Sequence, residues 1–191
     1  MNLPNKLTIL RVLLVPVFVI VLFLPEWFGF PSEAAAWLAA IVFIGASVTD
    51  MLDGKIARKR NLITDFGKFM DPIADKLLTC SAMIMLTYLN RLHPAATILF
   101  IGREFVISGF RLIAAKKGVV IAADNMGKAK TVLQMIFIPA LLLESCRPFS
   151  WLLPYFDWLW QAVMLVTLTI SVWSCVRYIV NNKGVVDFHD C

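Results

Sequence analysis

Charged residues are scarce in this chain of 191 residues. They make up only 16% of it, while apolar residues make up 60% and the mean hydropathy is +0.78. A soluble domain of this size exposes too much surface to hide so much apolar material. A disordered chain or a coiled coil would carry far more charge. The composition therefore predicts an integral membrane protein that forms one domain over residues 1–191.

Cysteine is also scarce, and its placement excludes a secreted disulfide scaffold. Four cysteines stand at positions 80, 146, 175 and 191, and their spacing matches no metal-binding motif. Three of them lie in or beside apolar runs, so we expect packing residues or free thiols.

A signal-peptide cleavage site is missing as well. Met1–Arg11 is basic and precedes an apolar run, but Val21–Phe30 contains no A-x-A-like segment. We therefore expect the first apolar run to be a membrane helix.

Apolar runs near the length of a membrane span recur along the chain. A helix needs about 20 residues to cross the hydrocarbon layer, and the runs are too continuous for barrel strands. The sequence therefore predicts an all-α, polytopic membrane protein. The six predicted spans are Leu7–Leu24, Ala34–Asp53, Asp71–Leu89, Pro94–Ala115, Gly127–Leu143 and Leu152–Val176.

The basic residues are distributed very unevenly between the two sides of these spans. Of the 18 Lys and Arg residues, only Arg91 and Arg147 fall on the second side. By the positive-inside rule, both termini and the two long basic loops are predicted to face the cytoplasm from the cell membrane, inner or plasma. The net charge of +5 is then explained by these loops, without nucleic-acid binding.

Two pairs of aspartates stand at the cytoplasmic ends of the second and third spans. Asp50 and Asp53 are three residues apart, and Asp71 and Asp75 are four apart, so each pair lies on one helix face. The 17-residue loop Gly54–Met70 is predicted to bring the pairs together. Four converging carboxylates repel one another unless cations are present, and carboxylate ligands without His or Cys favour Mg²⁺, Mn²⁺ or Ca²⁺.

A purely structural explanation is open for each aspartate taken singly. Asp71 precedes Pro72, which is the pattern of an N-cap followed by proline at the first helical position. Asp50 and Asp53 fit a polar helix end. Gly54 and Gly67 fit a helix C-cap and a loop turn.

Read as one segment, the aspartates belong to the pattern D-x2-D-G-x2-A-R-x8-G-x3-D-x3-D. All eight specified positions are present, and they are Asp50, Asp53, Gly54, Ala57, Arg58, Gly67, Asp71 and Asp75. This pattern resembles the signature of the CDP-alcohol phosphotransferase family. With the six-span layout, the resemblance extends over most of the chain.

The resemblance implies displacement of CMP from a CDP-linked lipid by an alcohol, with two divalent cations, Mg²⁺ or Mn²⁺. It implies that the four aspartates hold the metals and that Asp75 is also the general base. By the same resemblance, Gly54, Ala57 and Gly67 let cytidine approach the backbone, and Arg58 binds the pyrophosphate. A homodimer is also implied.

Two other segments resemble phosphatidylglycerophosphate synthases, a branch of that family. In Pro4–Arg11, the resemblance implies that Asn5, Thr8 and Arg11 face the phosphates of the nucleotide lipid; interfacial snorkelling is an alternative for Lys6. The second segment, Gly102–Arg111 with Gly127–Thr131, contributes Arg103, Arg111 and Lys128. These three basic side chains suit an acceptor that carries its own phosphate, so CDP-diacylglycerol and glycerol 3-phosphate are the implied substrates.

Three alternatives stay open at this point. Glu104 could pair with Arg111, seven residues on and on the same helix face, which would make Arg111 structural. Another acceptor would make the protein a cardiolipin or inositol-phosphate-type enzyme of the same family. A cation transporter also uses intramembrane carboxylates, but it favours midplane sites and internal repeats, which this sequence does not display.

Overall fold

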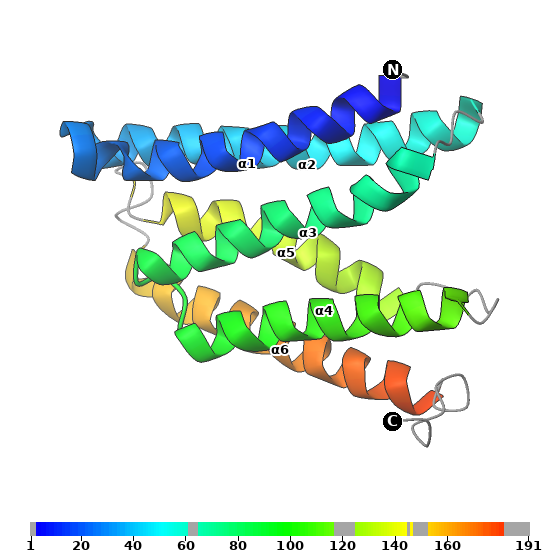
Figure 1. Ribbon diagram of the computed structural model, residues 1–191. Helices are drawn as coiled ribbons and strands as arrows, with labels where there is room; N and C mark the ends of the chain where they lie inside the picture. Colours follow the sequence, from blue (N-terminus) through cyan, green and yellow to red (C-terminus); the bar gives the residue numbers. More distant parts are fainter. Residues whose placement is uncertain (1–2, 61–64, 117–124, 145, 147–152, 182–191) are drawn as a thin grey trace. The chain divides into compact units, whose positions relative to one another are not determined.

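The computed structural model describes residues 3–60, 65–116, 125–144, 146 and 153–181. Some side chains within these ranges lie outside the description, among them those of residues 50–69, 71, 72, 75 and 125–130. The described part is all-helical, as predicted, and contains no strand. Its six helices are α1 (Leu3–Phe28), α2 (Ser32–Arg60), α3 (Asp65–Tyr88), α4 (Pro94–Lys116), α5 (Asn125–Leu143) and α6 (Leu153–Asn181) (Figure 1). The chain divides into two compact units, residues 1–92 with 138–157 and residues 93–137 with 158–191.

Three described segments are long and apolar enough to cross a membrane. They are Leu7–Phe28, Ser32–Thr49 and Gln161–Asn181, and shorter apolar helical segments occur at Lys76–Tyr88 and Thr131–Leu143. Helix α4 is not among them, which fits the charges of Arg103, Glu104 and Arg111 within it. The prediction of a helical membrane protein agrees with these segments, while the crossing of all six helices stays a prediction.

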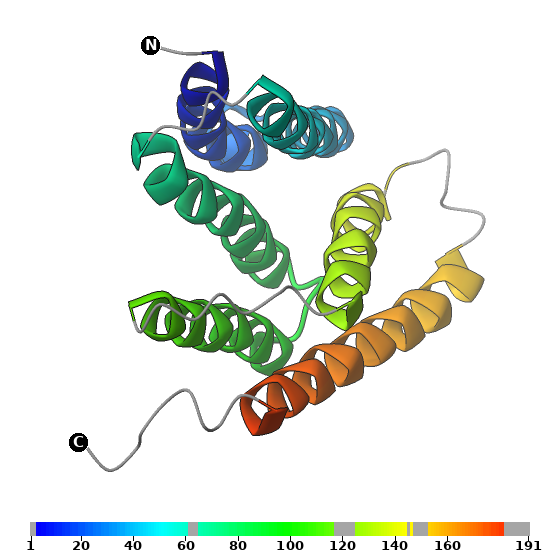
Figure 2. The same ribbon diagram turned by 90° about the vertical axis from the view of Figure 1, so that its right-hand side faces the viewer.

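The first unit is held together by α1, which packs against both α2 and α3 (Figure 2). The buried face of α1 continues from Val15 through Phe18 to Leu22, with the spacing of one helical stripe. The facing stripe of α2 consists mostly of small residues, which let two helix backbones approach closely in a membrane. Its buried members are Ala35, Ala36, Ala39, Ala40, Phe43, Ala46 and Ser47.

Helices α2 and α3 both extend further than the sequence pattern predicted. The expected loop over Gly54–Met70 is wrong, because α2 continues to Arg60 and α3 begins at Asp65. The hydropathy pattern marks where a chain leaves the hydrocarbon layer, but a helix can continue beyond that boundary. A single glycine costs a helix only about 1 kcal/mol, so Gly54 and Gly67 do not end these helices.

The connection after α3 places an arginine at the end of α5. Asn90 adopts a left-handed conformation with φ of 57°, and the amides of Asn90 and Arg91 donate to the carbonyls of Thr87 and Leu86 in a Schellman pattern. The Arg91 guanidinium then donates from Nη1 to the carbonyl oxygens of Leu141 and Leu142, at 2.7 and 2.6 Å. These carbonyls belong to the last turn of α5. A positive charge there also interacts favourably with the negative end of the helix dipole.

In the second unit, α4 packs against α6 along an aromatic contact. Ile107, Phe110 and Tyr178 form a buried cluster, with Cys175 and Ile179 packed against it. The rings of Phe110 and Tyr178 meet edge to face, with centroids 5.7 Å apart. Large apolar side chains such as Leu112 on α4 and Trp173 on α6 are exposed, as expected of surfaces that meet lipid.

We expect Arg91→Ala to lower the stability of the protein by about 1.5–3 kcal/mol, the range for hydrogen bonds to a charged group. The α5 carbonyls would lose their donor, and burial, which lowers the pKa of Arg91, has already removed part of the surrounding water. Thermal unfolding in detergent measures the effect. Arg91→Lys is the matched variant, since it retains the charge but not the planar fork, and it should fall between the two. Identical melting temperatures for all three proteins would contradict this role.

Candidate active site

The four motif aspartates lie on two neighbouring helices of the first unit. Positions 50 and 53 belong to α2, and positions 71 and 75 belong to α3. The amino end of α1, the carboxyl end of α2 and the amino end of α3 lie at the same end of this unit (Figure 1). The backbone therefore brings both halves of the motif to one end of the three-helix arrangement.

Two ring contacts show where α1 meets its two neighbours, and residues can be counted along the helices from them. Phe18 of α1 meets Phe43 of the antiparallel α2, with ring centroids 6.2 Å apart. Seven residues before Phe18 and seven after Phe43, position 11 is level with position 50. Phe23 of α1 meets Tyr88 of the parallel α3 at 5.2 Å, so twelve residues earlier on each helix position 11 is also level with position 76.

Counted along ideal helices from these contacts, the four aspartate positions fall within one narrow layer. Positions 50 and 53 are level with positions 11 and 8 of α1, and positions 71 and 75 are level with positions 6 and 10. Five residues of helix rise separate the extremes, which is about 7.5 Å. A layer of this thickness is compatible with one shared cation site.

The side chains that the motif offers as cation ligands are all carboxylates. Among the side chains that the structure describes, no group of three or more His, Cys, Asp or Glu residues could hold a metal. The side chains of the four aspartates lie outside that description. The backbone placement and the all-oxygen donor set fit a hard divalent cation.

The polar residues at the start of α1 face the interior of the first unit. Asn5, Thr8 and Arg11 are all buried, and Arg11 is only 1% exposed although it carries a guanidinium. Their three-residue spacing continues the apolar stripe of Val15 and Phe18 toward the amino end. By the same count, Arg11 is enclosed at the level of Asp50 on α2 and of Lys76 on α3, which directly follows the motif residue Asp75.

The remaining motif positions are helical, which removes three structural explanations. Asp71 cannot be the N-cap of α3, because that helix begins six residues earlier at Asp65. Gly54 lies within α2 and is not its C-cap, while Gly67 lies within α3 and is not in a turn. Ala57 and Arg58 also lie on α2, and the side chain of Arg58 is outside the described residues.

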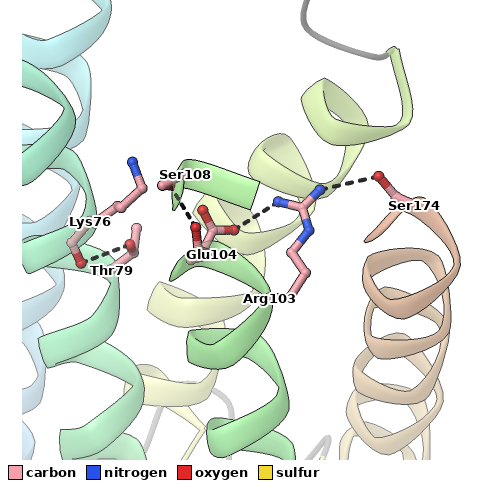
Figure 3. A network of polar contacts seen from close by, with 6 residues as sticks. All are labelled: Lys76, Thr79, Arg103, Glu104, Ser108 and Ser174. Carbon is pink, nitrogen blue, oxygen red and sulfur yellow. Dashed lines mark hydrogen bonds and ion pairs between the residues drawn. The ribbon is translucent and has the colours of Figure 1, made fainter. Parts of the chain in front are cut away.

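In the second unit, Arg103 of α4 is held from two directions (Figure 3). Its Nη1 is 3.0 Å from Oε1 of Glu104, and its Nη2 donates to the hydroxyl of Ser174 on α6 at 3.1 Å. The side chains of Arg103 and Glu104 are 9% and 20% exposed. The Ser108 hydroxyl donates to the Glu104 carbonyl at 2.6 Å, which satisfies this hydroxyl within its own helix.

Arg111 makes a different contact from the one that the sequence left open. Its guanidinium carbon lies 5.7 Å from the centre of the Tyr178 ring, within the range of a cation–π contact. The alternative of a Glu104–Arg111 pair is wrong, because Glu104 bonds Arg103 instead.

Sequence reasoning missed Ser174 and Tyr178, which contact the two arginines from α6. Both lie in or just beyond the longest charge-free stretch, so the pattern indicated only a membrane span. The available signal was the four-residue spacing of two polar side chains on that span. The remaining predicted acceptor residue, Lys128, lies on α5, and its side chain is outside the described residues.

We expect Glu104→Gln to destabilise the protein more than Arg111→Gln. Glu104 neutralises a guanidinium that is largely enclosed, and breaking such a pair costs about 3 kcal/mol. Arg111 is exposed and contacts a ring, a contact worth about 0.5–1 kcal/mol. Melting temperatures of the two variants in the same detergent measure the difference. Equal losses in the two variants would contradict the greater structural role of Glu104.

Comparison with known proteins identifies the family. The family model described as CDP-alcohol phosphatidyltransferase matches residues 1–182. A protein of Bacillus subtilis named CDP-diacylglycerol–glycerol-3-phosphate 3-phosphatidyltransferase is 45% identical over 181 residues, 91% of this chain and 92% of the relative. Proteins with the same name from Rickettsia felis and Shigella flexneri serotype 5b are 41% and 37% identical, over 75% and 93% of this chain and 76% and 93% of their own lengths. These matches confirm the resemblance seen in the motif: the chain belongs to the CDP-alcohol phosphatidyltransferase family.

Proposed function

We propose that this chain transfers the phosphatidyl group of CDP-diacylglycerol to the primary hydroxyl of sn-glycerol 3-phosphate, giving phosphatidylglycerophosphate and CMP. The observation that carries the proposal is the complete eight-position motif, whose aspartate positions share one layer of the first unit. The names of the relatives, which align over most of the chain, support this acceptor over that of a cardiolipin or inositol-phosphate-type enzyme. Membership of a transferase family also gives the transporter alternative no support.

In this proposal, Asp50, Asp53, Asp71 and Asp75 hold two divalent cations, Mg²⁺ or Mn²⁺. Bound there, such cations supply charge stabilisation for a diphosphate and its leaving oxygen. The cations also stabilise the aspartates in turn, because four neighbouring carboxylates repel one another when all are ionised. The support is the level placement of the four backbone positions and their hard oxygen chemistry.

Asp75 has a second role as the general base. It accepts the proton from the primary hydroxyl of the acceptor, and the hydroxyl oxygen forms a bond to the phosphatidyl phosphorus. The bond from that phosphorus to the bridging oxygen breaks, and CMP leaves with the bonding electron pair. A carboxylate can take this role only within hydrogen-bond reach of the hydroxyl, and position 75 lies one residue from the level of Arg11.

The nucleotide lipid is held by residues of α1, α2 and α3. Asn5, Thr8 and Arg11 face its phosphates from the buried stripe of α1, and Arg58 binds the pyrophosphate. Gly54, Ala57 and Gly67 leave room for cytidine beside the backbone. The burial of Arg11 at the aspartate level supports this assignment, since an enclosed guanidinium requires an anionic neighbour such as a carboxylate or a phosphate.

Arg103, Arg111 and Lys128 bind the phosphate of the acceptor. Planar guanidinium groups match phosphate oxygens in pairs. Support comes from the placement of Arg103 and Arg111 on one helix, both turned toward the same neighbour, α6.

We further propose that all six helices cross the cell membrane, with both termini and the aspartate layer at the cytoplasmic face. The uneven distribution of Lys and Arg supports this orientation. Both compact units then serve a single reaction, as one domain over residues 1–191. A homodimer is proposed on the family resemblance.

Asp53→Ala is expected to abolish release of CMP from CDP-diacylglycerol in the presence of glycerol 3-phosphate, because a cation ligand is lost. Chelation by EDTA should stop the unmodified enzyme equally, and added Mg²⁺ or Mn²⁺ should restore it. Glu26→Gln is the matched control, since Glu26 stands at the opposite end of α1, where it accepts a hydrogen bond from Tyr88 at 2.6 Å. Full activity of Asp53→Ala, or of the chelated enzyme, would exclude the cation site.

Arg103→Ala and Arg111→Ala are each expected to raise the KM for glycerol 3-phosphate. A charge-assisted contact is worth about 1.5–3 kcal/mol, equivalent to roughly a ten- to hundredfold increase. The KM for CDP-diacylglycerol should change little, because these arginines do not contact the nucleotide lipid in this proposal. Steady-state kinetics with each substrate varied in turn gives both constants. An unchanged KM for the acceptor in both variants would remove the support for a phosphorylated acceptor at this place.

A further inference from the structure

Helix α6 carries a buried polar face within an otherwise apolar membrane segment. Thr167, Ser171, Ser174 and Tyr178 follow one another at spacings of four, three and four residues, so they share one side of the helix. All four are at most 5% exposed, while neighbours such as Val172 and Trp173 are exposed. Polar groups buried in a membrane segment are costly unless they are bonded, so their alignment requires an explanation.

Two members of this face contact the two arginines of α4. Ser174 accepts a hydrogen bond from Nη2 of Arg103 at 3.1 Å, and the ring of Tyr178 lies 5.7 Å from the guanidinium carbon of Arg111. The other two do not reach α4 in this way. Thr167 donates to the carbonyl of Val163 on its own helix at 2.7 Å, and the hydroxyl of Ser171 has no hydrogen-bond partner among the described residues.

The two arginines contact positions on α6 that are closer together along the chain than the arginines are on α4. Arg103 and Arg111 are eight residues apart on α4, which corresponds to about 12 Å of helix rise. Their partners Ser174 and Tyr178 are only four residues apart on α6, or about 6 Å. Two guanidinium groups whose partners lie about one turn apart on α6 suit a single phosphate group better than two groups separated by the roughly 12 Å of rise between their positions on α4.

The partners on α6 add no negative charge beside the arginines. A hydroxyl and an aromatic ring both attract a guanidinium without carrying a negative charge. Glu104, in contrast, orients Arg103 and neutralises it at the same time. A carboxylate in place of Ser174 would pair with Arg103 and compete with an anionic ligand.

We propose that Ser174 and Tyr178 are positioning residues that aim Arg103 and Arg111 at the phosphate of the acceptor and so determine the affinity for it. This inference rests on the proposed function, in which the two arginines bind glycerol 3-phosphate. Ser174 acts through its hydroxyl and Tyr178 acts through its ring. Neither residue needs to touch the substrate.

The test measures the KM for glycerol 3-phosphate and for CDP-diacylglycerol in variants of the full-length enzyme. Ser174→Ala should raise the acceptor KM about tenfold, the lower end for a hydrogen bond to a charged group, and Ser174→Thr should restore it. Tyr178→Leu should raise the same constant about two- to fivefold, as for loss of an exposed cation–π contact, while Tyr178→Phe should leave it unchanged. The KM for CDP-diacylglycerol should stay constant throughout.

Ser171→Ala is the matched control. Ser171 lies three residues before Ser174 on the same face and is equally buried, at 1% exposure, but it makes no contact with Arg103. Its loss should leave both KM values unchanged. If Ser174→Ala does not fold, Ser174→Cys replaces it, since a thiol of similar size is a weak acceptor and should also raise the acceptor KM.

The outcomes separate this inference from the proposal on which it rests. If Arg103→Ala and Arg111→Ala raise the acceptor KM but the Ser174 and Tyr178 variants do not, the arginines bind the acceptor and the positioning role is wrong. If none of the arginine variants changes that constant, the acceptor site itself is wrong. A lower melting temperature of Ser174→Ala with an unchanged acceptor KM would reduce Ser174 to a structural role and overturn the inference.

Discussion

A charged side chain on a membrane helix has to be enclosed by other parts of the protein, because exposure toward the bilayer interior costs at least about 2.5 kcal/mol. Three of the described arginines meet this requirement in different ways. Arg11 is buried on the face of α1 that packs against its neighbours, and Arg103 lies between Glu104 and Ser174. Arg91, on the connection after α3, donates hydrogen bonds to carbonyl oxygens in the last turn of α5. In each case, enclosing the guanidinium requires that its helix or loop packs against the neighbouring element.

The apolar contacts of α1 decide where its charge is enclosed. Small residues along α2 allow close approach but do little to define the register of two helices. Register is defined by large side chains, here the Phe18–Phe43 and Phe23–Tyr88 ring contacts. A slip of one residue at these rings would move Arg11 by about 1.5 Å relative to the aspartate positions. Aromatic packing about two to three turns away therefore influences the geometry of the polar end.

The helical class was predictable because it depends on local composition and spacing, while the polar residues of α1 were singled out by resemblance to a family segment. Asn5, Thr8 and Arg11 recur every three residues, and the structure buries all three. The ends of α2 and α3 were not predictable in the same way, since charge at Lys55 or Lys68 marks the membrane boundary and says nothing about where a helix stops. The family followed from eight motif positions, because such a pattern combines residue type with spacing over 26 residues of chain.

The contacts of the acceptor arginines were beyond sequence reasoning because they join segments about 70 residues apart. Spacing along α4 correctly indicates that Arg103 and Arg111 are separated by about two turns, but it cannot identify the residues that contact them. Both contacts come from α6, a helix that carries no acidic side chain over Trp158–Val176. Acidic residues there would have enclosed the arginines more strongly, yet they would also have neutralised them. The hydroxyl of Ser174 and the ring of Tyr178 hold the guanidinium groups more weakly, and they add no negative charge to the one that Glu104 already places beside Arg103.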